Sequence, residues 1–81
     1  PEKFTDKLTW QRSGNSVTVT NPTPYYMNFS SVKVGGSTVK DASYVAPMSR
    51  ATFTLPAGAS GDISWVIIND FGSAGAEHRS R

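Results

Sequence analysis

The chain of 81 residues contains no cysteine and a single histidine, His78. A disulfide framework, a thiol nucleophile and most structural zinc sites are therefore excluded, because each requires cysteine or several histidines. The lack of cysteine does not identify a compartment, since oxidising locations permit disulfides without requiring them. We expect His78, in a weakly patterned polar tail, to be a solvated side chain rather than a catalytic base or a metal ligand.

Long apolar runs and clusters of cationic side chains are missing too. No run approaches the roughly 20 residues of a membrane span, so we expect neither membrane insertion nor a signal peptide within these residues. The net charge is +2, and lysines and arginines are scattered among acidic residues. Nucleic-acid binding needs clustered cations that displace counterions from phosphate, so we expect no nucleic-acid partner. Because the chain starts at Pro1 without Met, we expect an excised piece of a longer protein.

The sequence has no set of residues that indicates catalysis or a cofactor. Asp41, Asp62 and Asp70 each lie beside turn residues, where aspartate commonly caps backbone amides. Gly35-Gly36 lacks the Lys-Ser/Thr pair and the following helix of a phosphate-binding loop. An enzyme would need converging titratable groups in a pocket. We therefore predict neither enzyme activity nor a cofactor nor a bound metal.

What the sequence does contain is an alternation of apolar and polar residues with a period of two. This pattern is typical of half-buried antiparallel strands, with one face in the core and one in water. It recurs in segments 7–11, 16–20, 25–30 and 50–55. The expected inward-facing residues are Leu8, Trp10, Val17, Val19, Tyr25, Met27, Phe29, Ala51, Phe53 and Leu55. The most apolar run, 62–68, is expected to be a strand covered on both faces or lying at the domain centre.

Turn-forming residues separate these runs. Ser13-Gly14-Asn15 reads as a hairpin loop, Gly35-Gly36 as a turn, and segment 56–61 as a loop that cannot be a central strand. We count about six to eight short strands and no helix of useful length, as in a sandwich or barrel. The chain is thus predicted to be a single all-β domain over residues 1–72. Residues 73–81 are a polar tail or a weak last strand.

The aromatic residues suggest stacking on sugars or nucleotides, but the alternation favours the core. We expect about four in five of them to be buried, with Tyr26 and Tyr44 the ones exposed. The set comprises Trp10, Tyr25, Tyr26, Phe29, Phe53, Trp65 and Phe71.

Two segments carry more information than the strands. In Asn21-Pro22-Thr23-Pro24-Tyr25-Tyr26, each proline restricts the residue before it and cannot donate to a ladder, which predicts a rigid corner between strands. In Ile68-Asn69-Asp70-Phe71-Gly72, an apolar run ends in polar turn-formers. This second segment is either a capped strand end followed by a tight turn, or a site that fixes the domain against a neighbour.

These two segments resemble the C-terminal domain of the PapD-like periplasmic chaperones of the chaperone–usher pathway. Supporting matches are 8–16, which is similar to the opening of that domain, and 46–49 before 51–55. The resemblance runs from about Leu8 to Gly72. It implies an immunoglobulin-like antiparallel β-sandwich, the second of two domains set at an angle.

The resemblance also implies a function. Proteins of this family act in the periplasm of Gram-negative bacteria and use no cofactor. They bind pilus subunits, supply the strand that each subunit lacks and deliver the subunits to an outer-membrane usher. The interaction implied is the addition of a strand to an open sheet edge of the subunit. It covers surface of the subunit that would otherwise aggregate. The donated strand and the basic pair that anchors the subunit belong to the N-terminal domain. This chain is therefore expected to orient that domain and line the cleft, with the corner at Asn21, Pro22, Pro24, Tyr25 and Tyr26 near it.

By the same resemblance, Asp70 matches an aspartate that pairs with a basic residue of the other domain, and Asn69 shares this interdomain contact. With the partner absent, Asp70 is expected to be an unpaired, solvated carboxylate. Phe71 stands where tyrosine is common, which loses a hydroxyl but keeps the packing. An alternative from another class is an immunoglobulin-like adhesion or carbohydrate-binding module, because fold does not fix function. A coplanar exposed set of aromatics around Tyr26 and Tyr44 would favour it.

Overall fold

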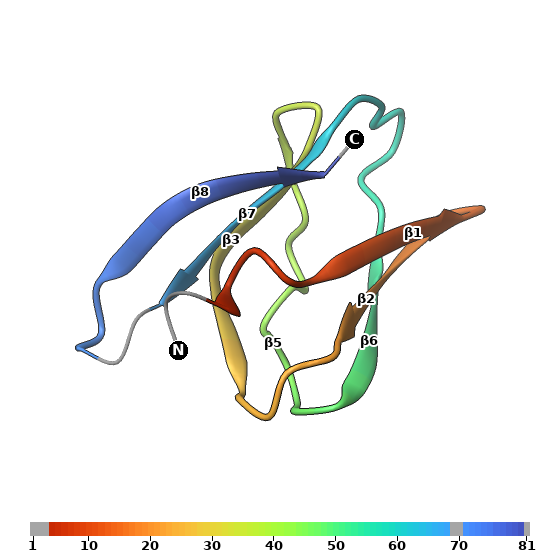
Figure 1. The fold of residues 1–81 in the computed structure, drawn as a ribbon. Coiled ribbons are helices and arrows are strands. Elements are labelled where there is room, and N and C mark those ends of the chain that lie inside the picture. Colours follow the sequence, from red (N-terminus) through yellow and green to blue (C-terminus); the bar gives the residue numbers. More distant parts are fainter. Residues whose placement is uncertain (1–3, 69–70, 81) are drawn as a thin grey trace.

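The computed structural model describes residues 4–68 and 71–80, whose regular structure consists of β-strands joined by turns and loops (Figure 1). The alternating segments form strands as expected, and the described residues contain no helix of useful length. The strands in chain order are β1 (Thr9–Ser13), β2 (Ser16–Asn21), β3 (Met27–Val34), β4 (Ser37–Thr38), β5 (Tyr44–Val45), β6 (Ser49–Thr54), β7 (Ile63–Ile68) and β8 (Ala74–Ser80).

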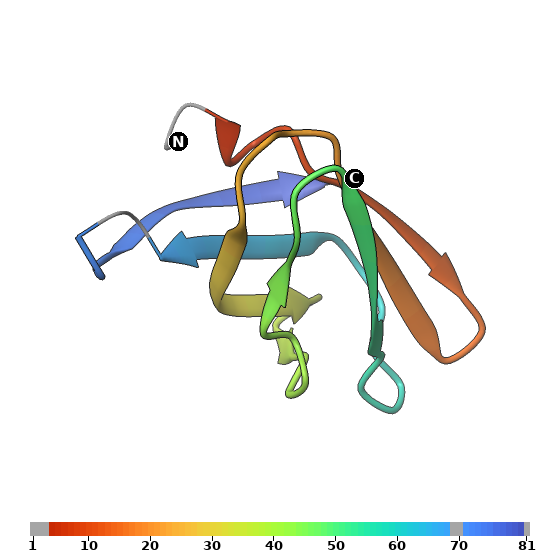
Figure 2. The ribbon, with the colours of Figure 1, turned by 90° about the horizontal axis from the view of Figure 1, so that it is seen from below.

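These strands form two antiparallel sheets that lie as separate layers around one core (Figure 2). The first sheet has the order β1-β2-β6. The second has the order β4-β3-β7-β8, with β5 also paired to β3. The expected all-β, immunoglobulin-like sandwich is therefore confirmed. It arises because each strand has one apolar face, and two such faces exclude water only by packing against each other.

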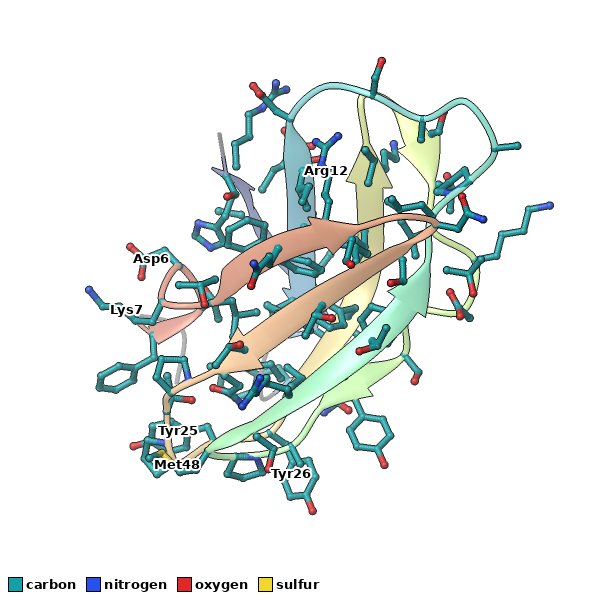
Figure 3. The ribbon with its side chains drawn as sticks, turned by 90° about the vertical axis from the view of Figure 1, so that its right-hand side faces the viewer. Asp6, Lys7, Arg12, Tyr25, Tyr26 and Met48 are labelled. Carbon is teal, nitrogen blue, oxygen red and sulfur yellow. The ribbon has the colours of Figure 1, made fainter. Side chains whose placement is uncertain are left out.

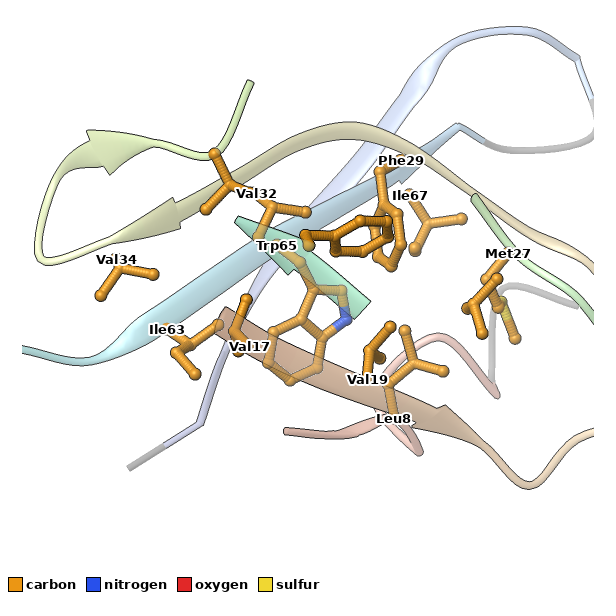
Figure 4. Packing of buried hydrophobic residues seen from close by; sticks show 13 residues of the cluster. Leu8, Val17, Val19, Met27, Phe29, Val32, Val34, Ile63, Trp65 and Ile67 are labelled. Atoms are coloured by element: carbon orange, nitrogen blue, oxygen red, sulfur yellow. The ribbon is translucent and has the colours of Figure 1, made fainter. Parts of the chain in front are cut away.

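Pairing between neighbouring strands brings the inward-facing residues together. In the first sheet Val17 lies opposite Phe53 and Val19 opposite Trp10. Both valines are fully buried. The ring centroids of Trp10 and Trp65, from opposite sheets, lie 5.4 Å apart. The core shown in Figure 4 consists of Leu8, Val17, Val19, Met27, Phe29, Val32, Val34, Val39, Val45, Phe53, Ile63, Trp65 and Ile67.

Strand β3 changes its inward phase halfway along. Met27 and Phe29 are buried, but so are Val32 and Val34, which lie on the opposite phase of a regular strand. The register against β7 shifts between Phe29 and Ser31. An extra residue at this point, as in a β-bulge, lets both halves of the strand face the core.

Strand β7 occupies the central position that its apolar sequence suggested, between β3 and β8. Ile63, Trp65 and Ile67 are buried, whereas Ser64 and Val66 on the other face are half-buried. The strand is thus central without being fully covered on both sides.

The tail forms the last strand, which was one of its two expected states, whereas the expectations for His78 and the aromatics need correction. Residues Ala74–Ser80 form β8 along β7, and His78 is half-buried there rather than solvated, with Nε2 2.7 Å from Thr5 Oγ1. Phe71 is 92% exposed and does not keep a core packing role. Tyr25 is 37% exposed, so fewer aromatics are buried than expected. The alternating pattern predicts Tyr25 as inward-facing because it extends the strand back to residue 25. In the structure β3 begins only at Met27, after the corner, so Tyr25 does not follow the alternation of the strand.

Polar contacts close the end of the sandwich opposite the corner. The Arg12 guanidinium on β1 donates to the Gly61 carbonyl, which links the first sheet to the chain entering β7. The Asp41 carboxylate accepts from the Thr54 amide at 3.2 Å, the capping role expected of it. Gly35 has φ +58°, and a Cβ there would overlap the Ser60 carbonyl oxygen. Only glycine fits this close approach of two loops.

Candidate interaction site at the proline corner

The proline segment carries the chain from one sheet to the other. Strand β2 ends at Asn21 in the first sheet, and β3 begins at Met27 in the second. Pro22 and Pro24 are exposed, whereas Asn21 before them and Thr23 between them are buried, at 0% and 5% exposure. The chain therefore crosses between the sheets at this segment, with the polar side chains of Asn21 and Thr23 buried.

Asn21 organises this corner through its buried amide. Its Nδ2 donates to the carbonyl oxygens of Tyr25 at 2.7 Å and Ala46 at 3.1 Å. Its Oδ1 accepts from the Thr23 amide at 3.0 Å and from Thr23 Oγ1 at 2.7 Å. Backbone groups that the prolines leave without ladder partners are thus satisfied by one side chain, as burial requires.

A second contact joins the corner to the turn before β6. The Met48 amide donates to the Thr23 carbonyl at 3.0 Å. Met48 has φ 52°, in the left-handed region that non-glycine residues rarely adopt. Its side chain is 71% exposed. The backbone at Met48 is therefore held in a costly conformation while the thioether faces solvent.

Exposed aromatic side chains gather around this corner. Tyr26 is 61% and Tyr44 50% exposed, which confirms the expectation for both, and their ring centroids lie 6.0 Å apart. Figure 3 shows Tyr25, Tyr26 and Met48 at the same end of the molecule. We call Tyr25, Tyr26, Tyr44 and Met48 the corner surface.

The chemistry of the corner surface suits a polypeptide partner. Segment 21–26 has no ionisable group other than the tyrosine phenols, so ionic recognition is not its basis. Tyrosines offer large apolar contact with a hydroxyl for hydrogen bonding, and their few rotatable bonds make ordering inexpensive. The sequence predicted that Tyr26 and Tyr44 are exposed but gave no prediction for Met48. The only signal was Pro47, which marks a break before β6.

The other predicted site residues, Asn69 and Asp70, lie outside the described residues. On either side of them, Ile68 at the end of β7 is 39% exposed and Phe71 is 92% exposed. Apolar surface on both sides fits an interdomain contact, which stays a prediction.

Residues 4–68 and 71–80 hold no group of three or more His, Asp or Glu side chains arranged to bind a metal ion. No helix among them is long and apolar enough to cross a membrane.

Comparison with known proteins gives one consistent answer. Residues 3–79 match the family of the pili assembly chaperone PapD, C-terminal domain. The chaperone protein MyfB of Yersinia enterocolitica is 46% identical over 81 residues, which cover 90% of this chain and 30% of MyfB. The chain thus spans under a third of the length of this relative.

Solved structures agree with the sequence comparison. The Escherichia coli chaperone DraB has a TM-score of 0.91 at 38% identity, over 100% of this chain and 40% of that one. A chain in the complex of Salmonella enterica SafA pilin with the SafB chaperone has a TM-score of 0.94 at 41% identity, over 99% of this chain and 38% of that one. The chain therefore belongs to the family of C-terminal domains of PapD-type pili assembly chaperones.

Proposed function

We propose that this chain is the second domain of a periplasmic chaperone that binds pilus subunits and delivers them to an outer-membrane usher. The observation that carries the proposal is the corner surface, exposed and rigidly supported by Asn21, in a chain of this family. A preceding domain would add the strand that a subunit lacks. This domain would orient it and line one side of the cleft.

The second part of the proposal concerns the junction between the domains. Asn69 and Asp70 would contact the preceding domain, with Asp70 paired to one of its basic side chains. The exposed Ile68 and Phe71 on either side would supply apolar contact. No bond-making chemistry is needed, because strand addition satisfies backbone groups and covers apolar surface.

The corner surface favours protein binding over the carbohydrate alternative. A sugar-stacking platform needs rings that present one face, as in stacking of bases on aromatics. The rings of Tyr26 and Tyr44 are inclined by 42° to one another. They suit an irregular side-chain surface better than a flat pyranose.

A chimera tests the proposal directly. Residues 3–79 would replace the matching domain of the SafB chaperone, and SafA retention would be measured by co-purification from the periplasm. We expect the chimera to retain SafA, and Tyr26→Ala with Tyr44→Ala to lower retention about tenfold or more, as for paired aromatic anchors. Gln11→Ala, on the exposed face of β1, is the matched control. A folded chimera that fails to retain SafA, or one insensitive to both tyrosine changes, would contradict the proposal.

A further inference from the structure

The segment just before β1 crosses between the two sheets. We call residues 4–8 the strap. Thr5 and Leu8 within it are buried, at 8% and 4% exposure, and the Lys7 amide closes a turn onto the Phe4 carbonyl at 3.1 Å. Immediately afterwards the chain enters β1 of the first sheet.

Thr5 ties the strap to two strands of the second sheet. Its carbonyl accepts from Trp65 Nε1 on β7 at 2.8 Å, a buried contact. Its hydroxyl lies 2.7 Å from His78 Nε2 on β8. Trp65 and His78 are themselves register partners, with ring centroids 5.8 Å apart. The three residues thus form one contact unit, in which Trp65 holds the Thr5 carbonyl and His78 the Thr5 hydroxyl.

The strap also touches the proline corner, through the residue just before Thr5. The Phe4 ring lies 5.4 Å from the Tyr25 ring, centroid to centroid. Tyr25 belongs to the corner surface. The strap therefore contacts both the last strand, β8, and the corner surface. A preceding domain would be attached at the N-terminal end of the strap.

We propose that Thr5 and His78 are positioning residues that fix the direction in which the preceding chain leaves the sandwich, and that hold Tyr25 in place through Phe4. This inference rests on the proposed two-domain function. Without the Thr5 contacts, the strap would keep Leu8 in the core and the Phe4 ring contact with Tyr25, but it would lose its hydrogen bonds to the second sheet. His78 is thereby given a role in orientation rather than in chemistry.

The two indole N–H groups provide a built-in test in the 81-residue protein. Trp65 Nε1 donates to Thr5, whereas the buried Trp10 Nε1 has no partner within the described residues. We expect His78→Leu to move the Trp65 indole resonance and leave that of Trp10 in place. Amide exchange of residues 5–8 should rise about tenfold or more, with Val17 and Val19 unchanged, because the opening is local.

Conservative variants separate positioning from general stability. His78→Gln should restore the Trp65 signal and the slow exchange, because its amide nitrogen extends about as far as the imidazole Nε2. Thr5→Val keeps the carbonyl and removes the hydroxyl, and should reproduce the His78→Leu exchange pattern. Equal acceleration across the core, or no change in residues 5–8, would overturn the proposal.

The SafB chimera then tests the link to function. We expect His78→Leu to lower SafA retention severalfold and His78→Gln to retain it. Unchanged retention in His78→Leu would overturn the positioning role. Failure of the unmodified chimera would instead count against the proposed function, and the exchange pattern of the isolated chain would still report on the strap.

Discussion

The Asn21 side chain shows what a fully enclosed amide does for a loop that contains two prolines. Its oxygen accepts two hydrogen bonds from Thr23 in the corner, and its nitrogen donates to Tyr25 in the corner and to Ala46 before β6. Removing it would leave several buried groups unsatisfied at once. An unpaired buried group costs more than a typical hydrogen bond contributes.

We therefore predict that Asn21→Ala lowers the free energy of unfolding by about 3 kcal/mol or more, the range for broken buried networks. Urea unfolding of purified variants provides the measurement. Asn28→Ala, at an exposed position of β3, is the control and should change stability by less than about 0.5 kcal/mol. Equal effects of the two changes would show that the corner does not depend on Asn21.

The left-handed backbone at Met48 leads to a prediction of opposite sign. Replacement by glycine removes a steric cost of about 1–2 kcal/mol and adds chain entropy of about 0.5–1 kcal/mol to the unfolded state. We expect Met48→Gly to raise the thermal midpoint slightly. It should also weaken binding of a partner to the corner surface, because the thioether is lost. A lower midpoint would indicate that the side chain stabilises the isolated domain.

At the scale of the elements, Gly35 contacts the loop before β7, whereas its neighbour Gly36 does not. Gly35 and Gly36 both have positive φ, but only Gly35 has backbone where a Cβ would lie; around Gly36 the described chain leaves open space. We predict that Gly36→Ala costs about 1–2 kcal/mol from conformation alone. Gly35→Ala should cost more than about 3 kcal/mol or prevent folding, because backbone must move.

Comparison of amide spectra and urea midpoints of these two variants tests that prediction. Similar losses in both would mean that the loops separate readily. In that case the Gly35 amide, which donates to the Asp62 carbonyl at 2.9 Å, would not hold them together.

The strands differ in how far their sequences determine them. In β2 and β6 the alternation around Val17, Val19 and Phe53 suffices, since each apolar residue faces the core. The bulge in β3 is visible in the sequence as a phase change between Phe29 and Val32. Strand β8 could not be predicted with assurance, because its half-buried positions are Gly75, His78 and Ser80, and pairing with β7 supplies its stability.

The candidate site divides in the same way. Pro22 and Pro24 predict the corner from the sequence, because the effect of proline on φ and on hydrogen bonding is local. The pairing of Tyr26 with Tyr44 and the position of Met48 depend on contacts between distant segments. Those contacts follow from the sheet topology, which a local pattern does not contain.

For the whole molecule, the common core predicts one cooperative unfolding transition. Trp10 from the first sheet and Trp65 from the second touch in that core, so tryptophan fluorescence reports separation of the sheets. Far-UV circular dichroism reports loss of the strands. We expect the two urea transitions to coincide, as in a two-state domain. A fluorescence change that precedes the dichroism change would indicate that the sheets separate while strands persist.

The junction prediction also belongs at this scale. Since we expect Asp70 to be solvated in the isolated chain, Asp70→Ala should alter the free energy of unfolding there by no more than about 1 kcal/mol. In the SafB chimera the same change should lower SafA retention by loosening the domain angle. A large stability loss in the isolated chain would identify Asp70 as a structural cap instead.

The hydrogen bond between Thr5 and His78 joins residues 73 positions apart. Closing a loop of that length has a substantial entropic cost. This contact therefore forms only after most of the chain between the two residues has folded. During synthesis from the N-terminus, the strap must wait for the last strand before it becomes fixed. A domain that precedes the strap would complete its own folding before the strap is fixed to β8. Its orientation relative to the sandwich would therefore be set last.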